Sequence, residues 1–341
     1  MKEVTIFYNS PQQHLTQAVT GFLLLKEQGK ISLTIEYGKF KKHCDYLKVL
    51  VDGKLCIYDM ADSSIIKKEL YNECDYYFKR MCLKTDLETY PKLFPYGFNY
   101  SCFTKGTGFL KMNLKIYPIK KMTELLRITP FMGKFIGMTD TIEDNYYKNY
   151  ECNPAEKKPF IVFSARLWNP EKSNMEDLKE ERIVINEERI DMITKLKANF
   201  GKNYIGGIYK NEFSAKRAAA DVLISKEHYK KSVFIRTIKK SSIGIATPGL
   251  ENSVGYKLAE YLASSMAILT HPHIKDFAFP GDFSENKNYF CYQSANECVA
   301  IIKNLLSNDA VLKKMIANNN SYYGNYLSPD KLIENTLAKV A

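Results

Sequence analysis

The chain has 341 residues, of which 45% are hydrophobic, and its formal net charge is +11. This length suits two domains rather than one, and the composition is typical of a folded globular protein, not of a disordered or fibrous one. No apolar run approaches the roughly 20 residues of a membrane-spanning helix. The opening residues, MKEVTIFYNS, read as a strand and lack the apolar core of a signal peptide, so we expect a cytoplasmic protein.

The excess of lysine and arginine favours anionic partners. The lysines are scattered in pairs, and no signature of a nucleic-acid-binding module is present, so we expect no nucleic acid partner. Two readings of the charge remain open: a solvated surface, or a basic face that makes peripheral contact with anionic lipid at the inner side of a membrane.

The eight cysteines include no CxxC pair and no Cys/His cluster with zinc-ligand spacing. We therefore expect free, mostly buried thiols and no metal site.

The first half of the chain alternates strand and helix signals. The predicted elements are a strand at 4–8, a helix at 15–26, a strand at 31–37, and two strands at 46–51 and 54–58 around the Asp52-Gly53 turn. The β-α-β opening predicts a parallel sheet. The loop DMADSS at 59–64 follows a strand directly, where α/β proteins tend to place ligand contacts.

The second half begins after a polar, proline-containing boundary at 151–159 and repeats the alternation more regularly. We predict strands at 160–164, 204–208, 243–246 and 267–270, and helices at 187–200, 227–237 and 254–264. This pattern predicts a doubly wound α/β domain. The expected domains are 1–155 and 156–325, and a last helix is expected within 326–341, after Ser328-Pro329.

The segment 241–272 is the most informative one. A strand ends at Ala246, the loop TPGLENSVG follows, and a helix starts near Gly255. Backbone N–H groups at a helix N-terminus, with a glycine that permits close approach, favour phosphate binding. Glu260 lies further along this helix, and a carboxylate can accept hydrogen bonds from ribose hydroxyls.

This segment resembles the nucleotide-sugar loop of glycosyltransferase group 1, a large family with the GT-B fold. Gly255, Glu260 and Ala263 match the glycine, glutamate and alanine of the family pattern. The resemblance implies that Glu260 contacts the ribose of the donor. It also implies that Ser253, Val254 and Gly255 lie beside its diphosphate.

Two further comparisons with the family concern the donor. Asn252 stands where the family has a glutamate that touches the donor sugar, so it can bond a sugar hydroxyl but supplies no charge. The segment FIVFSARLWNPEKS resembles the strand and loop that open the donor domain, and it places Arg166 and Lys172 at the diphosphate. The spacing between them is one residue longer than in the common pattern.

The first domain is expected to bind the acceptor and to provide the general base. His14, Asp59 and Asp62 are the candidate bases, because each follows a predicted strand. Lys79 and Arg80 are candidates for contact with an acidic acceptor. The alternative interpretation is that they are only the basic end of a half-buried strand.

The resemblance thus implies a GT-B fold, with two Rossmann-like doubly wound α/β domains that face a central cleft. It also implies a strand at 289–291 and a helix at 294–306 after the donor site, and a terminal helix that crosses back to the first domain. It implies transfer of a sugar from a nucleotide diphosphate donor to a glycan or lipid-linked glycan, as in surface polysaccharide biosynthesis. Asp59 and Asp62 are one residue too far apart for a DxD motif, so we expect a metal-independent enzyme without a cofactor. The alternatives are a GT-B-shaped sugar-nucleotide epimerase and a degenerate subunit that only binds the nucleotide sugar. The nucleotide base, the sugar, the acceptor, the anomeric outcome and the oligomeric state stay open.

Overall fold

The computed structural model describes residues 1–106, 108–116, 141–173 and 175–341. The chain divides into two compact units. Unit 1 consists of Met1–Asn149, Asp276–Asp282 and Tyr323–Ala341, and unit 2 consists of Tyr150–Lys275 and Phe283–Tyr322. The sequence analysis places the boundaries after residues 155 and 325, and it does not include the short return at Asp276–Asp282.

Unit 1 is built on a six-stranded mixed sheet in the order β2-β1-β3-β4-β5-β6. The strands are β1 (Lys2–Tyr8), β2 (Ile31–Tyr37), β3 (Tyr46–Val51), β4 (Lys54–Asp59), β5 (Tyr76–Lys79) and β6 (Leu93–Pro95). Only β3 runs antiparallel to its neighbours, β1 and β4. The carboxyl ends of β1, β4 and β5 therefore lie along one edge of the sheet.

The predicted hairpin is confirmed. Asp52 and Gly53 have φ of 49° and 81°, the left-handed values that a two-residue turn between twisted strands requires. The predicted parallel pairing of the first two strands is also confirmed, with all seven residues of β1 opposite those of β2.

Helices cover both faces of this sheet. On one face, α1 (Thr16–Glu27) packs against α13 (Pro329–Leu337), and Tyr58 of β4 stacks on Phe78 of β5 and bonds Thr336 of α13. On the other face, α2 (Lys68–Glu73) covers Ile57 and Tyr77. The unit also contains α3 (Asp86–Thr89) and α4 (Gly108–Ile116).

Unit 2 has a six-stranded sheet in the order β12-β11-β10-β7-β8-β9, with every neighbouring pair parallel. The strands are β7 (Lys158–Ala165), β8 (Tyr204–Tyr209), β9 (Leu223–Ile224), β10 (Ser241–Ala246), β11 (Ala267–Thr270) and β12 (Tyr289–Cys291). Numbered within the unit, this order is 6-5-4-1-2-3, the order of the Rossmann fold. The predicted class of two Rossmann-like α/β domains is confirmed, with one antiparallel strand in unit 1.

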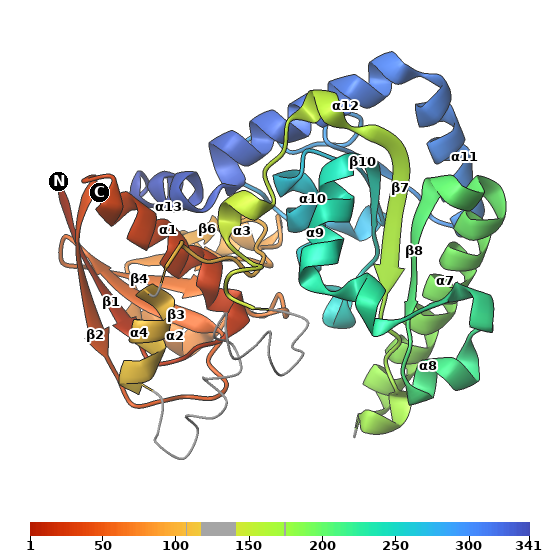
Figure 1. The fold of residues 1–341 in the computed structure, drawn as a ribbon. Helices are drawn as coiled ribbons and strands as arrows, with labels where there is room; N and C mark the ends of the chain where they lie inside the picture. Colours follow the sequence, from red (N-terminus) through yellow and green to blue (C-terminus); the bar gives the residue numbers. More distant parts are fainter. Residues whose placement is uncertain (107, 117–140, 174) are drawn as a thin grey trace. The chain divides into compact units, whose positions relative to one another are not determined.

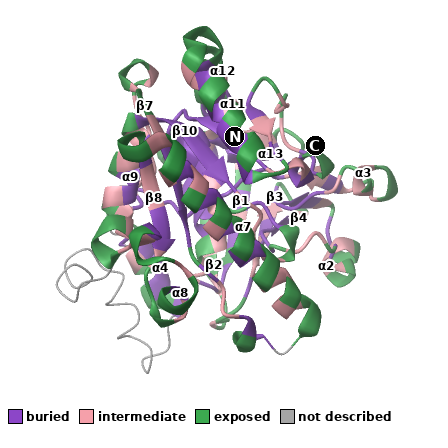
Figure 2. Ribbon diagram, turned by 90° about the vertical axis from the view of Figure 1, so that its right-hand side faces the viewer, coloured by how far each residue is buried: buried purple, intermediate pink, exposed green. Residues whose placement is uncertain are grey.

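The sheet of unit 2 lies between two layers of helices (Figure 1). One layer contains α7 (Glu176–Phe200) and α11 (Ala295–Ser307), and the other contains α9 (Lys231–Lys240) and α10 (Tyr256–Ala263). The unit also has α8 (Glu212–Arg217) and α12 (Asp309–Tyr322). Figure 2 shows the central strands buried and the outward sides of the helices exposed.

Helix α7 begins 11 residues before the predicted start at 187, since its first residue is Glu176. Only Ile185 and Asn186 are buried between 176 and 186, so the apolar periodicity that signals a helix is absent there. Its predicted end is confirmed, because Gly201 adopts a φ of 50° directly after the helix.

None of the described helices is long and apolar enough to cross a membrane. All eight cysteines are free, and six of them are buried, as predicted from their spacing.

The close packing of α1 on α13 can be tested at Gly21. A Cβ at this position would lie 2.2 Å from the carbonyl oxygen of Pro329. We expect Gly21→Ala to destabilise unit 1 by about 1–3 kcal/mol, because overpacking outweighs the gain in helix propensity. Hydrogen exchange of α1 and α13 should become faster. Gly324→Ala is the control, since a Cβ there meets nothing within 4 Å; equal exchange in the two variants would contradict this account.

Candidate functional site

The carboxyl ends of β7 and β10 lie side by side, at the point where the strand order of unit 2 reverses. In open α/β sheets, ligands bind in the crevice at this point. β7 ends at Ala165 and β10 at Ala246, so the segments that start at Arg166 and Thr247 form the two rims.

Helix α7 holds the first of these loops through side chains on one of its faces. Arg182 donates to the carbonyl oxygen of Asn169 at 2.9 Å. The Asn186 amide accepts from the N–H of Trp168 at 2.8 Å and donates to its carbonyl oxygen at 2.7 Å. Arg182, Asn186 and Arg189 are four and three residues apart, the spacing of one helix face.

Arg189 bridges both loops. Its Nη1 donates to the carbonyl oxygen of Arg166 at 2.7 Å, and its Nη2 donates to that of Pro248 at 3.1 Å. The residue is only 8% exposed. In the part of the chain that the structure describes, its Nε has no hydrogen-bond partner and no carboxylate forms an ion pair with it.

This cation is electrostatically unfavourable as it stands. Burial lowers the pKa of Arg189 to about 10, although the negative charge of Glu188 opposes this shift, and the positive charge of Arg166 adds to it. A buried charge without a counter-ion costs several kcal/mol. An anion at the rim of the crevice would relieve this cost.

The sequence-predicted diphosphate ligands Arg166 and Lys172 both lie on the β7 loop and are exposed. The guanidinium of Arg166 lies 6.0 Å from the Trp168 ring. Neither side chain forms an ion pair with any described residue. Their positive charges are therefore available to a ligand at the loop whose backbone Arg189 binds.

The second loop is tightly folded. The N–H of Gly249 donates to the carbonyl oxygen of Ser253 at 2.8 Å. Glu251 and Asn252 both adopt left-handed φ values, of 58° and 51°. Such values cost non-glycine residues free energy, and they are enriched at ligand-binding turns. The carboxylate of Glu181, from α7, accepts the N–H of Asn252 at 3.2 Å, so α7 holds this loop as well.

The predicted donor residues of this loop differ in exposure. Asn252 and Gly255 are exposed, whereas Ser253 and Val254 are buried. Gly255 is the N-cap of α10, and a Cβ built on it would meet no atom within 4 Å. The N-terminus of α10 is therefore open to a ligand, and only backbone groups of the buried pair could reach it.

Glu260 is buried on α10, and its carboxylate pairs with Lys231 of α9. The Nζ of Lys231 lies 5.5 Å from the ring centroids of both Tyr150 and Phe234. The negative charge of Glu260 is thus already compensated within the unit. Its role at a ribose stays a prediction.

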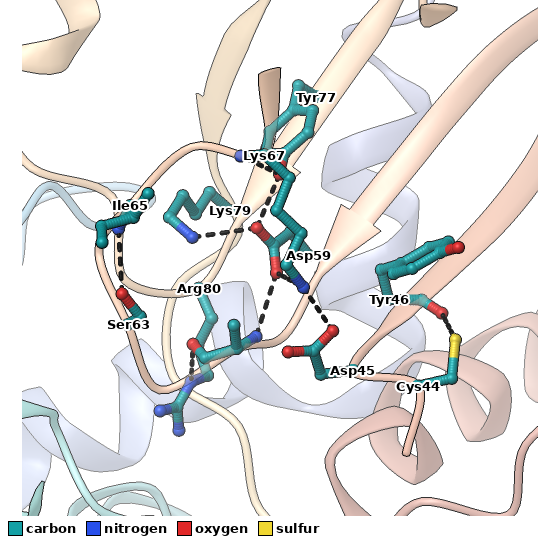
Figure 3. A network of polar contacts seen from close by, with 11 residues as sticks. Cys44, Asp45, Tyr46, Asp59, Ser63, Ile65, Lys67, Tyr77, Lys79 and Arg80 are labelled. Carbon is teal, nitrogen blue, oxygen red and sulfur yellow. Dashed lines mark hydrogen bonds and ion pairs between the residues drawn. The ribbon is translucent and has the colours of Figure 1, made fainter. Parts of the chain in front are cut away.

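In unit 1, Asp59 at the end of β4 is the centre of a buried polar network (Figure 3). Its carboxylate accepts hydrogen bonds from Lys79 Nζ at 2.9 Å and from the Tyr77 hydroxyl at 2.6 Å, and Lys67 Nζ lies 3.5 Å away. Burial opposes ionisation, but these neighbours outweigh it and hold the pKa of Asp59 below its usual value.

This network corrects two expectations. Lys79 is fully buried and pairs with Asp59, so it does not face an acceptor. Asp59 is equally buried, and a carboxylate with a lowered pKa is a weak base. For Lys79, the alternative of a strand with a basic end describes the structure better.

The other unit 1 candidates come together at the same edge. Arg80 is buried, pairs with Asp62, and donates to the Asn99 Oδ1 at 3.0 Å. The Asn99 amide donates to the carbonyl oxygen of His14 at 3.2 Å. Burial, and next the positive charge of Arg80, lower the pKa of His14 below its usual value. Its imidazole is therefore neutral at pH 7 and able to accept a proton.

Among the residues that the structure describes, no group of three or more His, Cys, Asp or Glu is arranged to hold a metal ion.

Sequence reasoning missed Arg189 and Asn186. A signal for Arg189 was present, because the residue shares the buried face of α7 with Met192, Ile193 and Leu196. A charged residue on an apolar helical face needs a partner, and that requirement identifies it as a candidate.

No family model matches the chain, and the comparison with curated proteins also gives no match. Solved structures give likenesses of low sequence identity. An α1,3-fucosyltransferase is 11% identical, with 99% of this chain and 91% of that one covered and a TM-score of 0.41. HepE from Anabaena, in complex with UDP-glucose, is 8% identical, with both chains covered completely and a TM-score of 0.39.

The C-terminal domain of LpcC from Francisella tularensis is 11% identical, covering 52% of this chain and 95% of that one, with a TM-score of 0.34. It is described as a glycosyl transferase group 1 family protein, the family that the sequence motifs resemble. These TM-scores lie below 0.5, so the function proposed below rests on the geometry of this chain.

The buried pair of Asp59 and Lys79 predicts a specific pattern of stability. Asp59→Asn leaves Lys79 buried without a counter-ion, and we expect a loss of about 3–5 kcal/mol. The double variant Asp59→Leu/Lys79→Met should lose much less, because it removes both charges. Urea unfolding monitored by circular dichroism measures the difference, and Glu73→Gln, in an exposed pair with Lys48, is the control, with at most about 1 kcal/mol expected.

The same pair predicts a pH dependence. Because the pKa of Asp59 is lowered in the folded state, its contribution is present above the unfolded value of about 3.9 and is lost as the pH falls through the folded value. The double variant should lack this component of acid destabilisation. Identical acid profiles for the wild type and the double variant would contradict the assignment.

Proposed function

We propose that the protein is a glycosyltransferase that binds the diphosphate of a nucleotide sugar at the crevice between β7 and β10. Arg189 is the single observation that supports this most. It is a buried cation without an ion-pair partner among the described residues, and it joins the two loops at the position where Rossmann-like sheets bind ligands.

The chemistry of sugar transfer fits this arrangement. When the bond between the anomeric carbon and the diphosphate breaks, negative charge grows on the leaving group. Arg166 and Lys172 offer a guanidinium fork and a point charge, and the N-terminus of α10 adds backbone donors. Positive groups that are fixed before the reaction stabilise that charge without a metal, so we propose metal-independent catalysis.

We assign the remaining roles as follows. The exposed amide of Asn252 bonds a hydroxyl of the donor sugar, and Glu260 binds the ribose once its contact with Lys231 opens. In unit 1, His14 is the general base that takes the proton of the acceptor hydroxyl. Asp62, half exposed and beside Arg80, orients this region.

The acceptor that we propose is a glycan or a lipid-linked glycan, at the cytoplasmic face of a membrane, in the synthesis of a surface polysaccharide. The net charge of +11 suits an anionic membrane surface.

The donor site can be tested by isothermal titration with UDP, GDP, TDP and CMP. One nucleoside diphosphate should bind, and Arg166→Ala and Arg189→Met should each weaken it roughly tenfold to a hundredfold, since charge-assisted hydrogen bonds contribute about 1.5–3 kcal/mol. Arg217→Ala is the matched control: this arginine is exposed on α8 and packs over Phe213. Emission from Trp168, the only tryptophan, verifies that unit 2 is folded in each variant.

Four results would overturn parts of this proposal. If no nucleotide binds, or if Arg189→Met binds as well as the wild type, the donor site is wrong. Conversion of the free nucleotide sugar into an epimer without an acceptor would identify an epimerase. Tight binding without turnover on any acceptor would identify a binding subunit.

His14 gives a kinetic test. A neutral imidazole is needed, and its pKa is lowered, so kcat/KM should fall only below pH 6.5 on the acid side. His14→Gln should lower kcat by roughly a hundredfold or more while the titrated affinity for the nucleotide is unchanged. His43→Gln, in an exposed loop, should match the wild type; an unchanged kcat in His14→Gln would remove His14 from the mechanism.

A further inference from the structure

Unit 1 contains a cavity of about 400 Å³. None of the residues that line it belongs to the proposed donor site or is a candidate base. It lies between the ends of β5 and β6, the last turns of α13 and the segment 279–281. Its size and apolar lining are typical of a small-molecule site. The lining residues are Phe78, Phe94, Pro95, Tyr96, Phe279, Pro280, Gly281, Tyr326, Leu332, Asn335, Thr336, Ala338 and Lys339.

Five of the thirteen lining residues are aromatic. Phe78 and Tyr96 are buried, and the rings of Phe78 and Phe94 pack with their centroids 5.7 Å apart. Phe279 stacks on Phe98, which fixes its ring beside the cavity. Rings held in this way offer a rigid apolar surface, and its solvation by water is unfavourable. The body of the ligand is therefore apolar.

One charged group limits the ligand further. At the C-terminal end of α13, Lys339 is exposed and forms no ion pair with a described residue.

We propose that this cavity binds an anionic single-chain amphiphile. The apolar chain contacts the rings, and a phosphate contacts Lys339. The site belongs to unit 1 alone and does not depend on the proposed donor site.

The test uses 1-lauroyl-glycerol 3-phosphate below its critical micelle concentration, titrated calorimetrically into the full chain. Two further ligands separate the contributions: 1-lauroylglycerol, which lacks the phosphate, and inorganic phosphate, which lacks the chain. We expect one binding site for the lauroyl phosphate, at least roughly tenfold weaker binding of the neutral lipid, and no binding of phosphate alone.

Two variants locate the site. Ala338 lines the cavity at an exposed position with a helical φ of −68°, so Ala338→Trp can fill the cavity from the chain end of α13. It should abolish binding or weaken it at least tenfold. Lys339→Glu should weaken binding of the lauroyl phosphate and leave the neutral lipid unchanged. Lys54→Glu, an exposed lysine beside the β3–β4 turn, is the matched control and should bind as the wild type does.

Binding of the lauroyl phosphate with equal affinity to Ala338→Trp would overturn the proposal, as would equal affinity of the wild type for the two lipids. If Ala338→Trp does not fold, Lys339→Glu decides the question alone. Titration of a nucleoside diphosphate should be the same in both variants, so a failure of this site is distinguishable from a failure of the donor site.

Discussion

The site in unit 2 depends on one buried guanidinium. Arg189 donates to the carbonyl oxygens of Arg166 and Pro248, which lie at the start of the loops that follow β7 and β10. A neutral side chain could make similar hydrogen bonds without the cost of burying a charge. An arginine without a carboxylate partner is best explained by an anion that approaches from the open side of the crevice.

The surrounding structure keeps this cation in place. Three polar side chains on one face of α7 bind the first loop, and Glu181 binds the backbone of the second. Helix α7 itself is fixed by an apolar face that packs on the sheet through Met192, Ile193 and Leu196. Packing of α7 in the core thus fixes the backbone of the two loops that carry the positive charges. Electrostatic stabilisation of a leaving group requires charges whose positions are set before the reaction.

In unit 1, by contrast, the buried charges pair with each other. Asp59 and Lys79 neutralise each other completely within the protein, so they stabilise the edge of the sheet and leave little reactivity for chemistry. His14 lies at the same edge but differs from them, because its lowered pKa keeps it neutral and able to accept a proton. Asp59 and Lys79 thus form a structural ion pair, whereas His14 is a candidate base. All three residues lie at the end of a strand or after one.

Local signals in the sequence were sufficient for much of the fold. Asp52-Gly53 predicted the hairpin, Gly201 predicted the end of α7, and the small residues after Ala246 predicted the loop and the start of α10. Long-range contacts were not predictable in this way. The partner of Glu260, 29 residues earlier in the chain, and the burial of Lys79 both depend on which side chains the folded sheet brings together.

The first 11 residues of α7 were missed because only Ile185 and Asn186 are buried among them, so no apolar periodicity marks this part of the helix. Arg189 was missed because its function depends on two loops that are 59 and 23 residues away from it in the sequence. In the sequence, such a residue can be recognised only as a charged residue among the apolar residues of a buried helical face.

Hydrogen exchange of the whole chain, with and without a saturating nucleoside diphosphate, tests the central claim most directly. Because one guanidinium joins both rims of the crevice, we predict that the ligand protects the backbone amides of 166–173 and 247–258 together, at the same ligand concentration. Protection of only one of these loops, or protection at any other place without these two, would contradict the assignment of the crevice between β7 and β10 as the donor site.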